Sequence, residues 1–142
     1  TPPPAPTPPR AGPPWTNSLG MRFVPPKSRD FTNHLFSVWE TRVQDFDAFV
    51  DRGATNGPDL KARCTPSFTQ AVDHPVVLVS QDDARAFCRW LTDEEQEKGL
   101  LRPDQFYRLP RDLEWSTAVG VTNEDRSHTP QMRRDIAKPA YL

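Results

Sequence analysis

The chain has 142 residues, enough for one domain, and its 18 Lys and Arg residues nearly balance its 19 Asp and Glu residues. The net charge of −1 argues against nucleic acid as the main partner, because phosphate binding needs a concentrated basic face. No stretch approaches the roughly 18 consecutive apolar residues of a membrane span, and no signal-peptide pattern opens the sequence.

The N-terminal segment is rich in proline, with ten of the chain's 17 prolines in the first 26 residues. Proline has no backbone N–H and a fixed φ, so such a segment cannot pack a core. Residues 1–29 contain four basic residues and no acidic one, which gives them a charge of +4 and leaves −5 for the remainder. We predict a disordered, semi-rigid linker at 1–15 and one folded domain at 16–142.

Four short strands are predicted. After a turn at 17–20, Met21 and Phe23 lie two residues apart and therefore share one face of a strand. The remaining strand candidates are segments 35–40 and 106–109 and the nearly all-apolar run 74–79, which we expect to be buried on both sides.

A first helix is predicted at 42–51. Thr41 and Gln44 have the spacing of a capping box, in which the Thr hydroxyl accepts from the N3 amide. Gly53 supplies the stop, and the following segment 53–66 is rich in turn-forming residues, so we predict a loop there. The apolar residues at helical spacing are Val43, Phe46, Phe49 and Val50.

The most regular helical pattern lies at 81–97. Ser80 is the expected N-cap, and Asp82 and Asp83 in the first turn suit the helix dipole. A third helix is predicted at 112–119, with Gly120 as its stop. Short strands, three helices and long irregular connections together indicate an α+β fold. The helix at 81–97 has an apolar stripe of Ala84, Phe87, Cys88 and Leu91, opposite Asp82, Arg85, Arg89, Asp93 and Gln96.

The two cysteines do not form the pattern of a nucleophile with its base. Cys88 lies on the apolar stripe, where a small buried hydrophobe is the simplest interpretation. Cys64 falls in the predicted loop beside Lys61 and Arg63, which could lower the pKa of its thiol, although an incidental loop cysteine explains it as well. A disulfide between the two cysteines stays open as an alternative.

No metal site is predicted, because the three histidines lie far apart and none has a second ligand at zinc-site spacing. His74 is expected to make a backbone hydrogen bond. The two acids at 82–83 have an explanation in the helix dipole, so they do not require calcium. The other histidines are His34 and His128, and the acidic run of Asp93, Glu94, Glu95 and Glu97 is predicted to be a solvated helix face.

No phosphate-binding glycine motif and no nucleophile elbow occurs in the sequence. The aromatic residues stand at helical spacing and are expected to form core rather than a ligand platform. The residues themselves therefore predict no catalytic, cofactor-binding or metal-binding side chain. The aromatic residues in question are Phe46, Phe49, Phe87, Trp90 and Trp115.

Five ordered blocks of the sequence resemble the formylglycine-generating-enzyme (sulfatase-modifying factor) family. The second is similar to the family's WETRVQDY segment, the third to HPVVNVSW, the fourth to the DAxAFCxWLT helix and the fifth to YRLPTDxEW; the first resembles the opening of the domain. The blocks are residues 17–25 (NSLGMRFVP), 38–46 (VWETRVQDF), 74–80 (HPVVLVS), 82–92 (DDARAFCRWLT) and 107–115 (YRLPRDLEW).

This resemblance implies an α+β fold related to C-type lectins, with little regular structure. Family enzymes oxidise a sulfatase cysteine to formylglycine with O₂ and a copper ion held by two cysteines. These cysteines and the calcium ligands belong to the C-terminal half, whereas residues 136–141 stand where members approach a YPWG segment. We therefore expect an N-terminal portion of the domain. Neither Cys64 nor Cys88 matches a catalytic position, and Cys88 corresponds to a structural helix cysteine.

Three residues depart from the family pattern, and they bear on whether the chain has the activity of the family. Leu78 stands where the family often has Asn, and Gln81 where it often has Trp. Arg111 replaces a Thr, which should weaken a capping box with Glu114 by roughly 1 kcal/mol. These changes favour either relaxed constraint on the sequence or a divergent member without oxidase activity.

The resemblance leaves two functions open, and a fragment without a function of its own is a third alternative. One is a sulfatase-modifying-factor domain whose partner is a sulfatase, with a chain that is itself catalytically incompetent and holds no copper or calcium. The other is a non-catalytic module of the same fold, displayed on the proline-rich tether to bind a protein or a small molecule. An extracytoplasmic or membrane-tethered location would fit either function.

Overall fold

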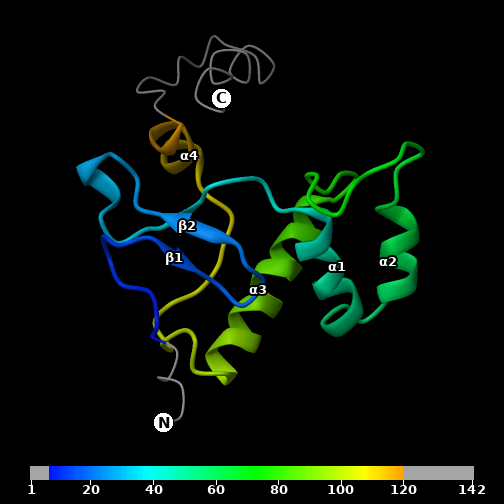
Figure 1. The fold of residues 1–142 in the computed structure, drawn as a ribbon, viewed down its shortest axis with the longest axis horizontal. Coiled ribbons are helices and arrows are strands. Elements are labelled where there is room, and N and C mark those ends of the chain that lie inside the picture. The colour runs from blue at the N-terminus through cyan, green and yellow to red at the C-terminus, as the bar shows by residue number, and fades with distance from the viewer. Residues whose placement is uncertain (1–6, 120–142) are drawn as a thin grey trace.

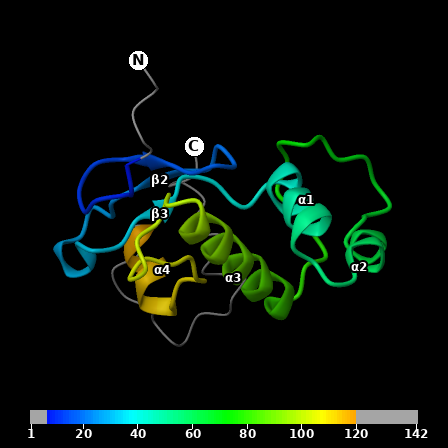
Figure 2. The same ribbon diagram turned by 90° about the horizontal axis from the view of Figure 1, so that it is seen from below.

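The computed structural model describes residues 7–119. Figures 1 and 2 show a small sheet at one side, α1 and α2 at the other, and α3 between them. This arrangement is compatible with the predicted α+β class. The elements are β1 Trp15–Thr16, β2 Arg22–Val24, β3 Phe36–Ser37, a 3-10 turn Arg29–Phe31, α1 Val43–Arg52, α2 Gly57–Arg63, α3 Gln81–Glu97 and α4 Asp112–Ala118.

The sheet is antiparallel, in the order β1-β2-β3. Phe23 pairs with Trp15 on one side and Ser37 on the other. The predicted turn before β2 forms because the Asn17 side-chain oxygen accepts from the backbone N–H of Met21 at 2.8 Å and because Gly20 adopts a φ of 76°. Met21 and Phe23 are 4% and 9% exposed, which confirms that they share a buried face.

Two of the predicted strands are absent from the described residues, and a third is shorter. Segment 74–79 makes only an isolated bridge from Pro75 to Arg42, because no neighbouring strand covers its other edge. Segment 106–109 is not a strand, since its backbone bonds to a side chain: the Tyr107 N–H donates to the Thr92 hydroxyl at 2.9 Å. In segment 35–40 only Phe36–Ser37 is a strand.

The first helix lies where the sequence predicts it, but its capping box is one residue further along. Arg42 is the N-cap, and Asp45 accepts from the Arg42 backbone N–H at 3.0 Å. The backbone at Thr41 cannot join the helix because it pairs with segment 74–79, where the Val76 N–H donates to the Thr41 carbonyl at 2.9 Å. The predicted box of Thr41 and Gln44 is therefore wrong.

Helix α2 corrects the predicted loop at 53–66. Pro58 stands in its first turn, where a fixed φ favours a helix and the missing N–H costs nothing. Gly57 begins the helix against α1, because a Cβ at this position would lie 2.5 Å from the Val50 carbonyl oxygen. Gly57 and Pro58, which the sequence assigns to a loop, are thus the first two residues of a short helix.

Helix α3 has the predicted bounds and the predicted cap. The Ser80 hydroxyl accepts from the Asp83 N–H at 3.1 Å, and the Asp83 carboxylate accepts from the Ser80 N–H at 2.8 Å. Its Phe87 and Leu91 side chains are buried in the core. The aromatic rings of Phe46, Phe49 and Phe87 lie 5.5–6.1 Å apart, with Trp90 at the edge of the cluster.

One residue of the predicted solvated face of α3 is buried. Glu95 is 0% exposed, and its carboxylate accepts from the Ser18 N–H at 2.8 Å, the Ser18 hydroxyl at 2.6 Å and the Tyr107 hydroxyl at 2.5 Å. The prediction fails because three donors from distant segments replace water around the carboxylate. Burial raises the pKa of Tyr107, and its bond to Glu95 adds to this effect.

Helix α4 holds a second buried carboxylate, which belongs to Glu114. It accepts two bonds of 2.6 Å from the Arg108 guanidinium and one of 2.7 Å from the Arg111 N–H. The half of the capping box that Glu114 supplies therefore persists without the Thr of the family pattern. The Arg108 hydrogen bonds are the main reason that the pKa of Glu114 falls to about 2.

Five expectations lie partly or wholly outside the described residues: Gly120 as a helix stop, His128, the segment 136–141, the end of the domain predicted at 16–142, and the first part of the linker at 1–15. In the described part of that segment, the carbonyl of Pro9 accepts from the Gln105 side chain at 2.7 Å. The boundary at residue 15 stays a prediction. Among residues 7–119 no helix is long and apolar enough to cross a membrane.

Candidate functional site

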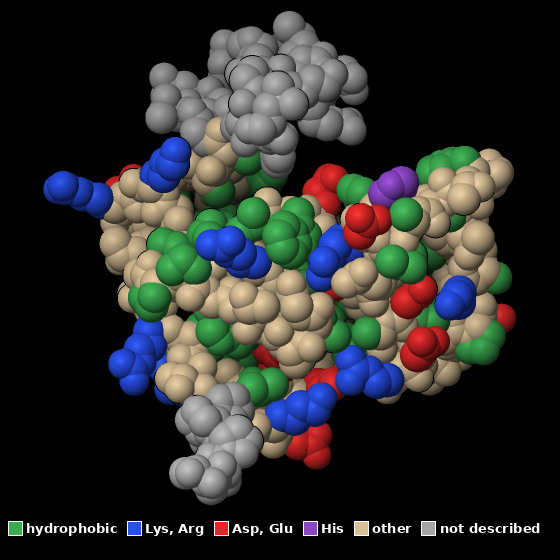
Figure 3. All heavy atoms as spheres, in the orientation of Figure 1, with side chains coloured by type: hydrophobic (Ala, Val, Ile, Leu, Met, Phe, Trp, Pro, Cys, Tyr) green, Lys and Arg blue, Asp and Glu red, His purple; other side chains and the backbone are tan. Residues whose placement is uncertain are grey.

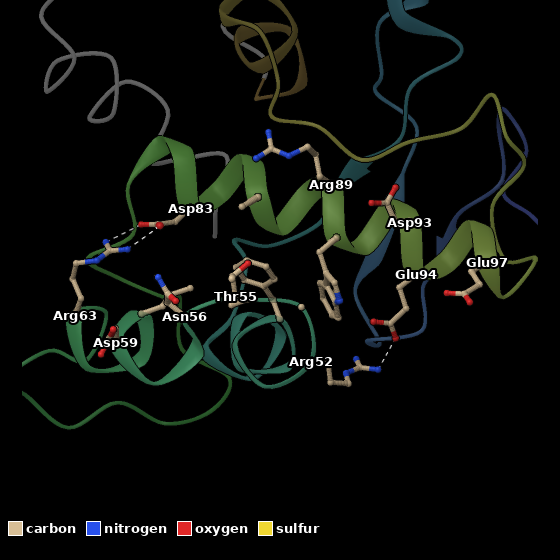
Figure 4. Close-up of a pocket in the computed structure, with 16 residues that line it drawn as sticks. Arg52, Thr55, Asn56, Asp59, Arg63, Asp83, Arg89, Asp93, Glu94 and Glu97 are labelled. Atoms are coloured by element: carbon tan, nitrogen blue, oxygen red, sulfur yellow. Dashed lines mark hydrogen bonds and ion pairs between the residues drawn. The ribbon is translucent and has the colours of Figure 1, made fainter.

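An open groove of about 840 Å³ lies between α3 and the segment formed by the end of α1, the connecting turn and α2. Figure 4 shows its residues from both sides, with Thr55 and Asn56 on the connecting turn facing α3. The α3 wall is a stripe of residues three or four apart, which one helix face presents to the groove. This stripe consists of Asp83, Ala86, Trp90, Glu94 and Glu97; Arg89 and Asp93 of the same helix also border the groove, and Figure 4 shows their side chains turned away from α1 and α2.

Ion pairs connect the two walls at two places. Near the start of α3, Arg63 of α2 forms two bonds with the Asp83 carboxylate, of 2.8 and 2.9 Å. These bonds hold the pKa of Asp83 well below its usual range. Further along, Arg52 of α1 donates to Glu94 at 2.5 Å. Figure 4 shows the two pairs at separate points along the groove.

The floor of the groove is apolar and depends on small residues. The indole of Trp90 lies against Gly53, where a Cβ would overlap Cδ1 of the ring. The Arg52 guanidinium lies 5.1 Å from the centre of the same ring, within the range of a cation–π contact. Phe49 and Ala86 complete this part of the lining. Gly53 therefore lets the end of α1 pack closely against the Trp90 indole of α3.

Four charged groups of the groove make no ion pair with another described residue. Three are acidic and one is basic, so the lining keeps an excess of negative charge after the two cross-groove pairs cancel. Figure 3 shows acidic side chains over the half that holds α1 and α2, while the face over the sheet is mainly basic and hydrophobic. The four groups are Asp59, Arg89, Asp93 and Glu97.

Neither cysteine belongs to the groove lining, and both are reduced. Cys64 ends α2 and is 8% exposed, and its thiol lies 3.5 Å from the Leu78 carbonyl oxygen as a weak donor. Burial raises the pKa of Cys64 and outweighs the opposing effect of Arg63, so the predicted lowering is wrong. Burial also raises the pKa of Cys88, a partly exposed residue packed against the core. No disulfide joins them.

The described histidines are also separate. His34 lies beside the Arg108–Glu114 pair, with its Nε2 atom 3.5 Å from the Glu114 carboxylate. The Nδ1 atom of His74 accepts from the Ala71 N–H at 3.4 Å, the kind of backbone bond predicted for it. Within residues 7–119, no group of three His, Cys, Asp or Glu side chains is arranged to hold a metal.

Sequence reasoning did not find the groove. Its α3 wall contains residues assigned to a helix–dipole cap and to a solvated face, and its other wall contains the helix that was expected to be a loop. The one sequence signal is the pair of small residues, Gly53 and Ala86, which stand beside large ones. Small residues at these two positions indicate a groove only when the two helices that carry them are known to pack together, so neither helix alone predicts it.

Comparison with known proteins identifies one family. The family model described as a sulfatase-modifying factor enzyme 1-like domain matches residues 13–139, which is most of the chain. No significant match was found among curated proteins or among solved structures.

Proposed function

Because the chain belongs to the family of sulfatase-modifying factor enzyme 1-like domains, we propose that residues 13–119 act as a scaffold of such a domain and perform no thiol oxidation of their own. The observation that carries this proposal is that Cys64 is buried and that Cys88, partly exposed, packs against the core. Formylglycine formation, the family role that the resemblance implies, would then depend on groups other than Cys64 and Cys88. The proposed partner in that role is a sulfatase polypeptide.

The two cysteines do not fit the copper centre that the resemblance implies. Copper binding and thiol oxidation both require a thiolate, which an electropositive and partly open setting favours. Burial raises the pKa of Cys64 and of Cys88, which disfavours the thiolate that both processes need. Asp83 is not available as a calcium ligand either, because its carboxylate already accepts hydrogen bonds from Arg63 and Ser80.

A direct assay tests the scaffold proposal. The purified chain is incubated with copper(I), O₂ and a cysteine peptide from a sulfatase, beside an active family enzyme as positive control. Mass spectrometry should find the aldehyde product only with the control enzyme. Aldehyde formation that disappears in Cys64→Ala or Cys88→Ala would overturn the proposal.

Thiol labelling provides a second measurement that does not depend on the substrate peptide. Both cysteines should react with an alkylating reagent much more slowly in the native chain than in urea, because burial limits access and protonation lowers nucleophilicity. Cys64 should be the slower of the two, as the more buried residue. Rapid native labelling at neutral pH would contradict the structural role of these residues.

A second candidate function is recognition, and the groove favours it. A ligand-binding module needs a concave surface with a partly apolar floor and a few fixed polar groups. The groove has these properties: Trp90 and Ala86 in its lining, and ion pairs that hold its walls together. In this role the domain would bind a protein or a small molecule on its proline-rich tether.

A further inference from the structure

We propose that two copies of this chain associate as an antiparallel pair, in which the basic outer face of the sheet of each copy lies against the acidic outer side of α1 of the other. This inference goes beyond the proposed function, and it rests neither on the thiols nor on the groove. It follows from the register of the sheet, the spacing of charges on α1 and the opposite signs of the two surfaces.

The first surface is the face of the sheet that points away from α3. Phe23 is buried on the inner side, so its neighbours Arg22 and Val24 lie on the outer side, because side chains alternate along a strand. The register continues this face onto β3, where Phe36 pairs with Val24. The Val38 N–H donates to the Arg22 carbonyl at 2.9 Å. Val38 is 46% exposed and Arg22 is exposed, so within residues 7–119 nothing covers this end of the face.

This outer face is basic. Lys27 and Arg29 follow β2 directly and are exposed. Within the described part of the chain, neither they nor Arg22 form an ion pair. Residues 7–41 contain four Lys and Arg residues against two acidic ones, a charge of +2. We call this surface the basic sheet face, made of Arg22, Lys27, Arg29 and Val38.

The second surface is the outer side of α1. Gln44, Asp47 and Asp51 are spaced three and four residues apart, so they share the side of the helix opposite its buried rings. The Val72 carbonyl accepts from the Gln44 N–H at 2.9 Å, which places Val72 and Asp73 at the start of this side. Val72 is 62% exposed and is the apolar part of the surface.

This side of α1 is acidic. Asp47 lies 3.6 Å from Lys61, whereas Asp51 and Asp73 form no ion pair with another described residue. Residues 42–98 contain eleven acidic residues against seven Lys and Arg residues, a charge of −4. We call this surface the acidic helix face, made of Asp47, Asp51, Val72 and Asp73.

The two faces are complementary in charge and in position. Figure 3 shows in one view the basic side chains over the sheet and the acidic ones over the half that holds α1 and α2. Because both surfaces are on one side of the molecule and at its two ends, a twofold axis brings each basic sheet face onto the acidic helix face of the other copy. The same contact then forms twice, and the net charge of −1 opposes it little.

Sedimentation velocity and light scattering test the proposal with the 142-residue chain, from about 5 to about 500 μM. At low ionic strength the mean mass should rise with concentration towards that of two chains. Added salt should reverse the rise, because it screens attraction between exposed charges.

Charge reversal locates the contact. Arg22→Glu/Lys27→Glu makes the basic sheet face acidic, and Asp51→Lys/Asp73→Lys makes the acidic helix face basic. Each variant alone should associate at least about tenfold more weakly, because like charges then meet at both contacts. An equimolar mixture of the two should recover association, since one contact of the mixed pair has both charges exchanged and the other is unchanged. This recovery also shows that both variants are folded.

A control separates the contact from overall charge. Arg85→Glu/Arg89→Glu changes the net charge as much as Arg22→Glu/Lys27→Glu, at exposed positions of α3 outside both faces, and should leave association nearly unchanged. Circular dichroism and thermal melts compare the folding of all variants with that of the parent.

Each outcome decides the proposal. Loss in both face variants with recovery in their mixture supports it. A monomer at every concentration would overturn it, as would equal loss in the control, no recovery in the mixture, or masses that grow beyond two chains. The aldehyde and labelling assays use separate readouts, so the scaffold proposal can fail without affecting this result.

Discussion

The two ends of α3 pack against different kinds of surroundings. Its N-terminal half lies against α1, where Phe46, Phe49 and Phe87 form a cluster of rings. Its C-terminal half lies near the sheet, where the Glu95 carboxylate connects the helix to Ser18 and Tyr107. The first region is held by apolar contact between neighbouring helices. The second is fixed by a buried charge that three donors must satisfy.

This difference sets how each region responds to change. Apolar packing loses stability roughly in proportion to the area or volume that is altered. A buried carboxylate responds more abruptly, because removing it leaves its former donors without partners and without water. We call the first part the ring region, around Phe46, Phe49, Phe87 and Trp90. The name carboxylate region covers the surroundings of Glu95 together with those of the second buried carboxylate, Glu114 of α4.

The largest expected effect is in the carboxylate region. Glu95→Ala should destabilise the fold by about 3–5 kcal/mol, because the Ser18 and Tyr107 hydroxyls lose their buried acceptor. Urea denaturation measures the change in the free energy of unfolding. The exposed residue Glu97 on the same helix supplies the control, since Glu97→Ala should change stability by less than about 0.5 kcal/mol.

A double-mutant cycle separates the network from simple loss of a side chain. In a Tyr107→Phe background one donor is already absent, so Glu95→Ala should cost at least about 1 kcal/mol less than in the parent. Additive effects would show that the Tyr107 hydroxyl and the Glu95 carboxylate do not stabilise each other, against the 2.5 Å contact.

The ring region should be destabilised by a substitution that overpacks it. Gly53→Ala places a methyl group where the Trp90 indole lies, and should destabilise the chain by about 2 kcal/mol. The φ of Gly53 is −121°, which alanine adopts without strain, so the whole cost is steric. The free energy of unfolding from urea titration gives the value.

Replacing the ring tests this cause. In a Trp90→Leu background the overlap with Gly53 disappears, so the additional effect of Gly53→Ala should fall close to zero. If Gly53→Ala remains equally costly without the indole, contact with Trp90 is not the reason that glycine is needed at the end of α1.

A change of pH should affect the two regions differently. The pKa of Glu114 falls from its ordinary value of 4.5 to about 2 in the folded chain, mainly through its hydrogen bonds to Arg108. A lowered folded pKa stabilises the protein above the unfolded pKa, and this stabilisation is lost as pH falls from about 4.5 towards 2. The difference in stability between the parent and Glu114→Gln should therefore shrink by about 1–2 kcal/mol over this range.

The ring-region variant gives the comparison for this experiment. Gly53→Ala changes no titrating group, so its effect on the free energy of unfolding should stay constant over the same pH range. A difference for Glu114→Gln that is equally flat would contradict the ion pair with Arg108 as a source of stability.

How well the sequence predicts each region follows from the range of its interactions. Helix α3 is predicted correctly because its cap, its apolar stripe and its end are all local patterns. The Asp45 carboxylate is buried too, but it bonds within its own helix start, to Arg42. Glu95 is different: its acceptor role depends on Ser18, which is 77 residues away. The period of α3 places Glu95 on its apolar stripe, four residues after Leu91, but the acidic residue type and the run of acids around it favour a solvated face, and the donors that satisfy it come from other segments.

The groove is unpredictable for the same reason. It needs α2, whose Gly-Pro-Asp start has the composition of a loop, and it needs the tight approach of Gly53 to Trp90. The misassigned strand at 74–79 shows the opposite error. There an apolar run is read as buried on both faces, yet Leu78 is 59% exposed because no second strand or helix covers it.

The smallest expected effect concerns that same residue and acts through the backbone alone. Leu78 has a φ of 60°, a left-handed conformation that costs most non-glycine residues about 1–2 kcal/mol and asparagine less. Leu78→Asn should therefore relieve strain while losing little apolar burial, and we expect a net stabilisation of about 0.5 kcal/mol. The asparagine that often stands at this place in the resembled family has a physical reason in this geometry. Thermal and urea melts of Leu78→Asn, with Val77→Asn as the adjacent control, measure the effect. The control should destabilise, because only position 78 has the positive φ, so equal losses at both positions would show that the left-handed backbone at Leu78 stores no recoverable strain.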